Sequence, residues 1–206
     1  MLFRSVSNKK SNLDRRAVVK KLLAPRASHE NEALVVTGLG SSSYDVGTCD
    51  HPLNYYLWGG MGGAAMIGLG LAIAQPKRRV LVVTGDGEML MGLGSLATIG
   101  VEKIRNLSIV VLDNELYSET GAQPTHTARG VDLAGIAKAA GFAHTGTISD
   151  EASLKTWIPK LYNTPGPVFV DFKVNASRYP LSIRLRDGTH IKNRFREALL
   201  GNKAFD

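Results

Sequence analysis

Short apolar runs alternate with segments of helical spacing along most of the chain. The runs that predict strands are 33–37, 80–84, 107–112 and 168–174, with shorter candidates at 55–58 and 143–145. Apolar positions that recur every three or four residues predict helices over 13–23, 64–74, 89–100, 132–140 and 150–162. Strands and helices alternating in this way are typical of a parallel sheet covered on both faces. The pattern predicts an α/β fold, a single three-layer domain with a mostly parallel sheet flanked by helices.

Polar residues and proline predict where these elements begin and end. Asn12 or Asp14 can cap the first helix, Pro25 ends it, and Ser149 can cap the last helix. The chain after Asn175 is basic and less regular than the rest. We therefore expect three segments: a basic N-terminal tail and helix over 1–28, a ligand-binding domain over 29–175 and a basic C-terminal extension over 176–206.

Composition supports one globular domain. The 206 residues are 44% hydrophobic, enough to bury one full core. The single cysteine, Cys49, excludes an internal disulfide, and it favours a structural role in a reducing compartment such as the cytoplasm. The apolar stretch 64–74 is about half of the ~20 residues that span a bilayer, so no membrane segment is expected.

The formal net charge is +7, and much of the excess lies near the two ends of the chain. The plainest interpretation is a set of solvated tails and helix faces. An attraction for anionic ligands or for an acidic partner subunit is the alternative. No nucleic-acid-binding motif accompanies the charge, so a nucleic-acid partner is not expected.

Three polar or glycine-rich turns follow predicted strands directly. They are the small-residue turn 38–43, Gly85-Asp86-Gly87 and Asp113-Asn114. Because parallel sheets bind ligands beyond the carboxyl ends of their strands, these turns are expected on one rim. The Asp86 carboxylate and the Asn114 amide oxygen suit Mg²⁺, and the glycines let backbone N–H groups approach a phosphate.

The segment from Gly85 to Asn114 resembles the diphosphate-and-metal signature of thiamine-diphosphate enzymes. It reads GDGEMLMGLGSLATIGVEKIRNLSIVVLDN. The resemblance implies that Asp86 and Asn114 bind Mg²⁺ with their side chains and Leu116 with its backbone carbonyl. It also places Gly85, Gly87, Glu88 and Tyr117 at the cofactor. Glu88 departs from the family pattern, because its carboxylate would repel a diphosphate unless it is turned away.

A second block, Trp58-Gly59-Gly60-Met61-Gly62, resembles the segment of this family that holds the aminopyrimidine. The resemblance implies that Gly59, Gly60 and Met61 contact this ring, and that the Met61 side chain keeps the cofactor bent. The bend brings the 4′-imino group near the thiazolium C2 proton. Gly60 and Gly63 stand where serine and histidine are often found. The loop after the first strand resembles a phosphate-side loop, which adds Thr37, Gly38, Gly40 and Ser41.

Within the family, the stretch from Gly85 to Gln123 looks most like sulfopyruvate decarboxylase beta subunits and phosphonopyruvate decarboxylases, and it includes SLATIG, LDN and ETGAQPT. This implies decarboxylation of a small anionic 2-oxo acid to an aldehyde. The catalytic candidates are Met61, His51 and Glu119, with Ser118 and Thr120 facing substrate. His51 fits a loop residue equally well. The cationic candidates for the substrate's acid group are Arg178, Arg184, Arg186 and His126.

The chain has no room for a second α/β domain that would supply the glutamate these enzymes need at the pyrimidine N1′. The resemblance therefore implies a hetero-oligomer, in which a separate alpha subunit carries that glutamate and the cofactor lies in the seam. Two alternatives stay within thiamine chemistry: a carboligase and a 2-oxo acid oxidoreductase subunit. The third alternative is a non-catalytic subunit that retains the cofactor site.

Overall fold

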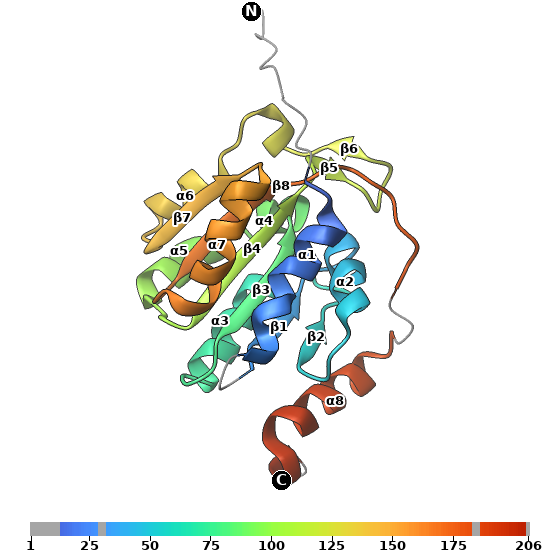
Figure 1. Cartoon of the computed structure of the whole chain (residues 1–206), viewed down its shortest axis with the longest axis vertical. Helices are drawn as coiled ribbons and strands as arrows, with labels where there is room; N and C mark the ends of the chain where they lie inside the picture. The colour runs from blue at the N-terminus through green and yellow to red at the C-terminus, as the bar shows by residue number, and fades with distance from the viewer. Residues whose placement is uncertain (1–12, 29–31, 183–185, 205–206) are drawn as a thin grey trace, which may run out of the picture.

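A six-stranded parallel sheet, in the order β2-β1-β3-β4-β8-β7, forms the centre of the molecule (Figure 1). This computed structural model describes residues 13–28, 32–182 and 186–204. The strands are β1 (Leu34–Thr37), β2 (Asn54–Tyr56), β3 (Val80–Gly85), β4 (Leu107–Asp113), β7 (His144–Ile148) and β8 (Val168–Lys173). The predicted α/β fold class is confirmed.

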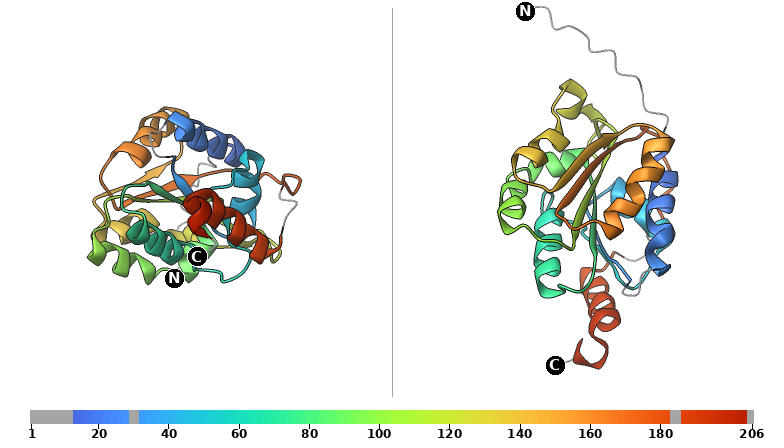
Figure 2. Two further views of the ribbon diagram at one scale, coloured as in Figure 1. Left: turned by 90° about the horizontal axis from the view of Figure 1, so that it is seen from below. Right: turned by 60° about the vertical axis from the view of Figure 1, so that its left-hand side comes forward.

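Helices cover both faces of the sheet and enclose two separate cores (Figure 2). One face is covered by α1 (Arg15–Leu23), α2 (Ser41–Val46) and α7 (Glu151–Asn163). The other is covered by α3 (Ala64–Ala74), α4 (Asp86–Met91), α5 (Ser95–Glu102) and α6 (Leu133–Ala139). Successive residues of a strand point to opposite faces, so Val82 joins one core and Val83 the other. Burial on both faces explains why the central strands are continuous apolar runs.

The segment between β4 and α6 contains short regular elements. It contains an antiparallel pair, β5 (Leu116–Tyr117) and β6 (Gln123–Pro124), followed by the 3₁₀ turn η3 (Thr127–Arg129). Three further 3₁₀ turns are η1 (Ala24–Ser28), η2 (Gly47–Cys49) and η4 (Gly201–Ala204). The β5–β6 pair lies at the carboxyl-end rim of the sheet (Figure 1).

The single helix predicted over 89–100 is wrong, because α4 and α5 are separate helices with a break between them. At the break, a Cβ added to Gly92 would lie 2.2 Å from the carbonyl oxygen of Gly62. Only glycine allows the turn to pack this closely on the loop that precedes α3. The small-residue turn 38–43 is also partly helical, since α2 begins at Ser41.

The caps of two helices test the predicted starts. Asp14 caps α1 and accepts a hydrogen bond from the Ala17 amide at 2.8 Å, whereas Asn12 lies outside the described residues. The cap of α7 is Asp150 rather than Ser149, and it accepts from the Ser153 amide at 2.9 Å. Among the described residues, no helix combines the length and the apolar character that crossing a bilayer requires.

The C-terminal extension is more regular than expected. It contains α8 (Gly188–Leu200), which packs against the edge strand β2 at the end of the sheet opposite the β5–β6 pair (Figure 1). The rings of Tyr55 and Phe195 meet edge to face at 5.8 Å, and Arg194 pairs with Asp50 at 2.9 Å. Aromatic and ionic contacts of this kind attach the basic extension to the sheet.

Candidate functional site

A pocket of about 150 Å³ opens at the carboxyl ends of β1, β3 and β4. Most of the predicted site residues line it: Gly40, Ser41, Met61, Gly85, Asp86, Gly87, Glu88, Asn114, Leu116, Tyr117 and Glu119. Ser118 and Thr120 line it as well. Three blocks that are far apart in the sequence therefore meet at one rim, as the parallel topology requires.

Asp86 is a nearly buried carboxylate at the first turn of α4, with 2% of its surface exposed. The Thr125 hydroxyl donates to its Oδ2 at 2.6 Å. Burial, followed by repulsion from the nearby Asp113 carboxylate, raises the pKa of Asp86. Within the described part of the chain Asp86 forms no ion pair, so no cationic side chain there balances a charge on this carboxylate.

Asp113, one residue before Asn114, is the centre of a buried polar network. It accepts from the Thr127 hydroxyl at 2.9 Å and pairs with the Lys173 ammonium. Lys173 also lies 3.6 Å from Asp171 and from Glu115. Burial and the charge of Asp113 raise the pKa of Asp171, and one of its oxygens has no hydrogen-bond partner among the described residues. Carboxylates outnumber ammonium groups at this rim.

Asn114 is held in a tight turn after β4. Its Oδ1 accepts from the Leu116 amide at 3.0 Å, and its Nδ2 donates to the Ser118 hydroxyl at 3.0 Å. Glu115 between them adopts a left-handed backbone with a φ of 63°.

The oxygen set of Asp86, Asn114 and the Leu116 carbonyl fits a hard divalent cation such as Mg²⁺, which usually completes its shell with phosphate or water. No group of three or more His, Cys, Asp or Glu side chains suited to a metal exists in the described ranges. A transition-metal site is therefore not indicated there, whereas an ion that shares ligands with a phosphate remains compatible.

Glu88 lines the pocket, but its carboxylate is engaged by the fold. It accepts from the Thr84 hydroxyl and, at 3.2 Å, from the Ala64 amide, and burial raises its pKa. A Cβ on Gly38 would overlap the Glu88 carboxylate, 1.5 Å away, so the loop after β1 requires glycine there. The Glu88 carboxylate is therefore bonded to the loops after β1 and before α3. This structural role explains why an acidic residue can follow the GDG turn.

Met61 is 37% exposed at the edge of the pocket, on the loop between β2 and α3. Gly59 and Gly60 flank it without lining the pocket, and a Cβ on either would meet nothing within 4 Å. Thr37 and Gly38 also lie outside the lining. The Thr37 hydroxyl instead forms a hydrogen bond with the Ser43 hydroxyl in the first turn of α2, at 2.6 Å.

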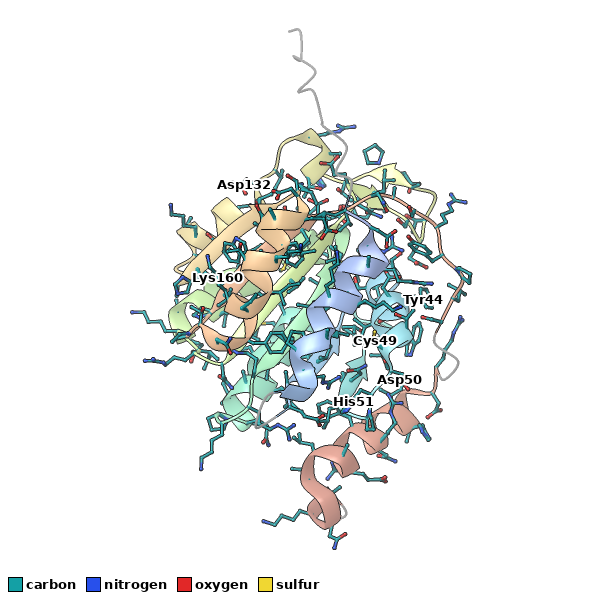
Figure 3. All side chains as sticks on the ribbon, in the orientation of Figure 1. Tyr44, Cys49, Asp50, His51, Asp132 and Lys160 are labelled. Atoms are coloured by element: carbon teal, nitrogen blue, oxygen red, sulfur yellow. The ribbon has the colours of Figure 1, made fainter. Side chains whose placement is uncertain are left out.

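His51 is placed away from the pocket, beside Asp50 and close to α8 (Figure 3). It precedes β2, and residues before a parallel strand lie at the edge of the sheet opposite those that follow it. Its Nδ1 accepts from the Leu53 amide at 3.1 Å, and its Nε2 lies 3.6 Å from Glu32. Burial, then the charge of Arg26, lowers its pKa. This geometry favours the loop role for His51 over the catalytic one.

The pocket also contains residues that the sequence did not indicate, most notably Arg15. The terminal basic residues were interpreted as a group. A local signal existed, however: Arg15 and Arg16 occupy the first turn of α1, where the helix dipole disfavours cations. None of the four cations proposed for a substrate acid group lines the pocket as described. Arg178 and His126 are exposed, Arg186 lies over the Trp58 ring at 5.4 Å, and Arg184 falls outside the described residues.

Comparison with known proteins agrees with this geometry. A family model described as "Thiamine pyrophosphate enzyme, C-terminal TPP binding domain" matches residues 38–172. The chain is 36% identical over 171 residues to the sulfopyruvate decarboxylase subunit beta of Methanothermobacter thermautotrophicus. This alignment covers 82% of this chain and 89% of that protein. The chain is also 39% identical over 161 residues to the phosphonopyruvate decarboxylase of Streptomyces viridochromogenes, in an alignment that covers 77% of this chain but 39% of that protein.

A solved structure shares the fold. The thiamine diphosphate-dependent 4-hydroxybenzoylformate decarboxylase of Rhodococcus jostii RHA1 superposes with a TM-score of 0.64 at 21% identity, over 87% of this chain and 36% of that one. The chain therefore belongs to the thiamine pyrophosphate enzyme family, whose C-terminal cofactor-binding domain makes up most of its length.

Proposed function

We propose that the chain is the beta subunit of a thiamine-diphosphate- and Mg²⁺-dependent decarboxylase that acts on a small anionic 2-oxo acid. The observation that carries the proposal is the pocket, where Met61, Asp86 and Asn114 from three separate sequence blocks line one cavity. The relatives named sulfopyruvate and phosphonopyruvate decarboxylase support the substrate class, an oxo acid with a sulfonate or phosphonate group. Its single cysteine supports a reducing compartment such as the cytoplasm.

A separate alpha subunit belongs to the proposal. The chain covers 89% of a relative named as a beta subunit but only 39% of a phosphonopyruvate decarboxylase whose name mentions no subunit. The rest of the phosphonopyruvate decarboxylase is long enough for a pyrimidine-binding domain. For this chain, a separate subunit would supply that domain. Glu88, Glu115 and Glu119 do not replace the activating glutamate. They belong to the rim of GDG and Asn114, and Glu88 is already hydrogen-bonded to Thr84.

The residues of the pocket would divide the work between holding the cofactor and handling the substrate. Asp86, Asn114 and the Leu116 carbonyl would hold Mg²⁺, and Gly85 and Gly87 would leave space for the diphosphate. The bound cofactor would supply the electron sink for loss of CO₂. Met61 would support the bent cofactor. Glu119 is exposed at the mouth beside Gly40, where a carboxyl group can hold a proton near the substrate.

The test is co-expression with a pyrimidine-domain partner, followed by assays of CO₂ release with Mg²⁺ and thiamine diphosphate. Sulfopyruvate, phosphonopyruvate and pyruvate are compared, and the aldehyde product is identified. We expect turnover of an anionic 3-substituted pyruvate by the complex, and none by this chain alone. A complex that binds the cofactor but turns over no 2-oxo acid would support a non-catalytic subunit instead. A product in which the decarboxylated fragment is joined to a second carbonyl compound would indicate a carboligase.

A further inference from the structure

Arg15 is the one cationic residue among the described residues that line the pocket. It stands at the first position of α1, outside every sequence block that defines the family signature. Its side chain is 6% exposed, so it belongs to the wall of the pocket rather than to a solvated tail. Asp86, Glu88 and Glu119 line the same pocket.

Asp45 holds the Arg15 side chain in place. The Arg15 Nε donates to one Asp45 oxygen, and the Arg16 Nε donates to the other at 3.0 Å. Asp45 is fully buried, so both of its oxygens are committed to this clamp. Within the described ranges, the two Nη nitrogens of Arg15 have no hydrogen-bond partner, and they present a fixed fork of N–H donors.

The clamp places two cations on one buried acid, and the Asp14 carboxylate at the cap of α1 also interacts with Arg15. Two guanidinium groups share the single carboxylate of Asp45. At the rim of the same pocket, Asp86 lacks a cationic partner in the described part of the chain. A diphosphate that carries Mg²⁺ would complete both sides, because the ion would neutralise Asp86 and the phosphate oxygens would accept from Arg15.

The position of Arg15 distinguishes the two ends of the expected cofactor. Asp45 lies one turn after Ser41 on α2, so Arg15 is beside the α2 wall of the pocket. Met61 lies on the loop that leads into α3, and α3 covers the opposite face of the sheet. Arg15 therefore lies beside the loop after β1 that is expected to contact phosphate, on the wall of the pocket away from the Met61 loop.

We infer that Arg15 binds the diphosphate of the cofactor through its Nη nitrogens, with Asp45 as the residue that orients it. This inference rests on the proposed function, because it assumes that the pocket holds thiamine diphosphate. It adds a phosphate-binding residue that comes from the N-terminal helix rather than from the family's signature blocks. The acid group of the substrate is the other anion with the same chemistry.

Arg16 is a matched control for Arg15. Both residues donate to Asp45, and both lie over the Tyr179 ring, at 5.8 Å for Arg15 and 4.4 Å for Arg16. Arg16 does not line the pocket. Arg16 also donates to the Pro180 carbonyl at 3.0 Å, so the two variants are compared by phosphate affinity and not by stability. A purely structural role of Arg15 would give Arg15→Met and Arg16→Met similar phosphate affinities, whereas phosphate binding would separate them.

The experiment is calorimetry on the full chain with Mg²⁺ and four probes: thiamine diphosphate, thiamine monophosphate, thiamine and inorganic pyrophosphate. We expect Arg15→Met to weaken binding of thiamine diphosphate and pyrophosphate about 30-fold, the scale of a lost charge-assisted pair. Arg16→Met should stay within about 3-fold of wild type, since it removes no phosphate contact. Arg15→Lys keeps a cation for Asp45 and should lose about 5-fold through the missing fork.

Each alternative outcome has a distinct meaning. Equal losses in Arg15→Met and Arg16→Met, or an unchanged Arg15→Met, overturn the inference. If Arg15→Met does not fold, Arg15→Lys decides, and unchanged affinity for both diphosphate probes overturns it. Normal cofactor affinity combined with a raised KM for the 2-oxo acid in the assembled complex assigns Arg15 to the substrate instead. No Mg²⁺-dependent binding by the wild-type chain, alone and in the assembled complex, would contradict the proposed cofactor site itself.

Discussion

Two buried carboxylates of this protein have opposite surroundings. Asp45 is fully buried and holds two arginines at the contact between α1 and α2. Asp86 is 2% exposed at the strand-end rim. Among the described residues its side-chain hydrogen-bond partners are threonine hydroxyls, and the charge that raises its pKa is the Asp113 carboxylate. The first region pairs its buried acid with two arginines. In the second region several carboxylates share the single ammonium group of Lys173.

This difference separates a structural ion pair from a ligand site. A buried charge that is already paired stabilises a local arrangement and has little left to offer a ligand. A buried carboxylate without a cation costs stability in the ligand-free protein, and binding of a metal ion recovers that cost. Arg15 pairs with Asp45 and also lines the pocket that contains Asp86, so the two regions meet at this residue.

The largest expected effect comes from breaking the balanced region. Asp45→Ala leaves Arg15 and Arg16 without their shared carboxylate, and we expect a loss of about 3–5 kcal/mol in the free energy of unfolding. Urea denaturation followed by circular dichroism measures this loss. Asp45→Asn is the matched control, because it keeps the shape and one acceptor oxygen and should lose less. Equal stability of Asp45→Ala and wild type would show that the arginines do not depend on this carboxylate.

Asp86→Asn should act in opposite directions on stability and on binding. Removing the charge relieves repulsion from Asp113, so the metal-free fold should become slightly more stable. The Mg²⁺-dependent affinity for thiamine diphosphate should fall at least ~100-fold, about 2.7 kcal/mol, because a ligand carboxylate is lost. Calorimetry with and without Mg²⁺ separates the two effects. Unchanged affinity would exclude Asp86 as a metal ligand.

The threonines that orient the rim should matter less than the ligand itself. Thr125→Val removes the hydroxyl that donates to Asp86 at 2.6 Å and leaves the volume nearly the same. Partners that orient a metal ligand are typically worth about 10-fold or more in metal affinity, and we expect about 10-fold weaker Mg²⁺ binding. Thr156→Val on the exposed face of α7 is the surface control. Equal Mg²⁺ affinity in both variants would remove Thr125 from the site.

The strand-end rim could be predicted from the sequence, whereas the contact between α1 and α2 could not. Strands buried on both faces appear as uninterrupted apolar runs, and polar residues directly after them must share one edge of the sheet. Asp86 and Asn114 were therefore within reach of local reasoning. The local signal at Arg15, a cation in the first turn of α1, did not identify its partner, since Asp45 lies 30 positions away and only tertiary packing joins them.

Two further discrepancies have the same origin in non-local contacts. The apolar spacing continues across Gly92, yet the helix breaks there because the Gly62 carbonyl approaches too closely for a side chain. His51 lies only seven positions before Trp58 in the sequence, but β2 runs between them and carries the chain across the sheet. Closeness along the chain therefore misplaced His51 at the rim.

The smallest expected effect concerns Asp171, which is one of the carboxylates around Lys173 but is not an expected metal ligand. Burial and the charge of Asp113 raise its pKa in the folded protein, so folding favours its protonated form. Its penalty is absent below the ordinary carboxyl pKa near 4, grows as the pH rises above that value, and levels off above the raised pKa. Wild-type stability in metal-free buffer should therefore decline over this window.

Asp171→Asn should flatten that decline, because the amide carries no charge to bury. Lys173 loses one partner at 3.6 Å but keeps Asp113 and Glu115. We expect a gain of about 1 kcal/mol at pH 9, about 2–4 °C in Tm, and little change near pH 4. Thermal melts with EDTA at several pH values measure it, with exposed Glu102→Gln on α5 as the control. A variant that is less stable than wild type at pH 9 would mean that Lys173 needs Asp171, and that this end of the rim is balanced in the way that Asp45 is.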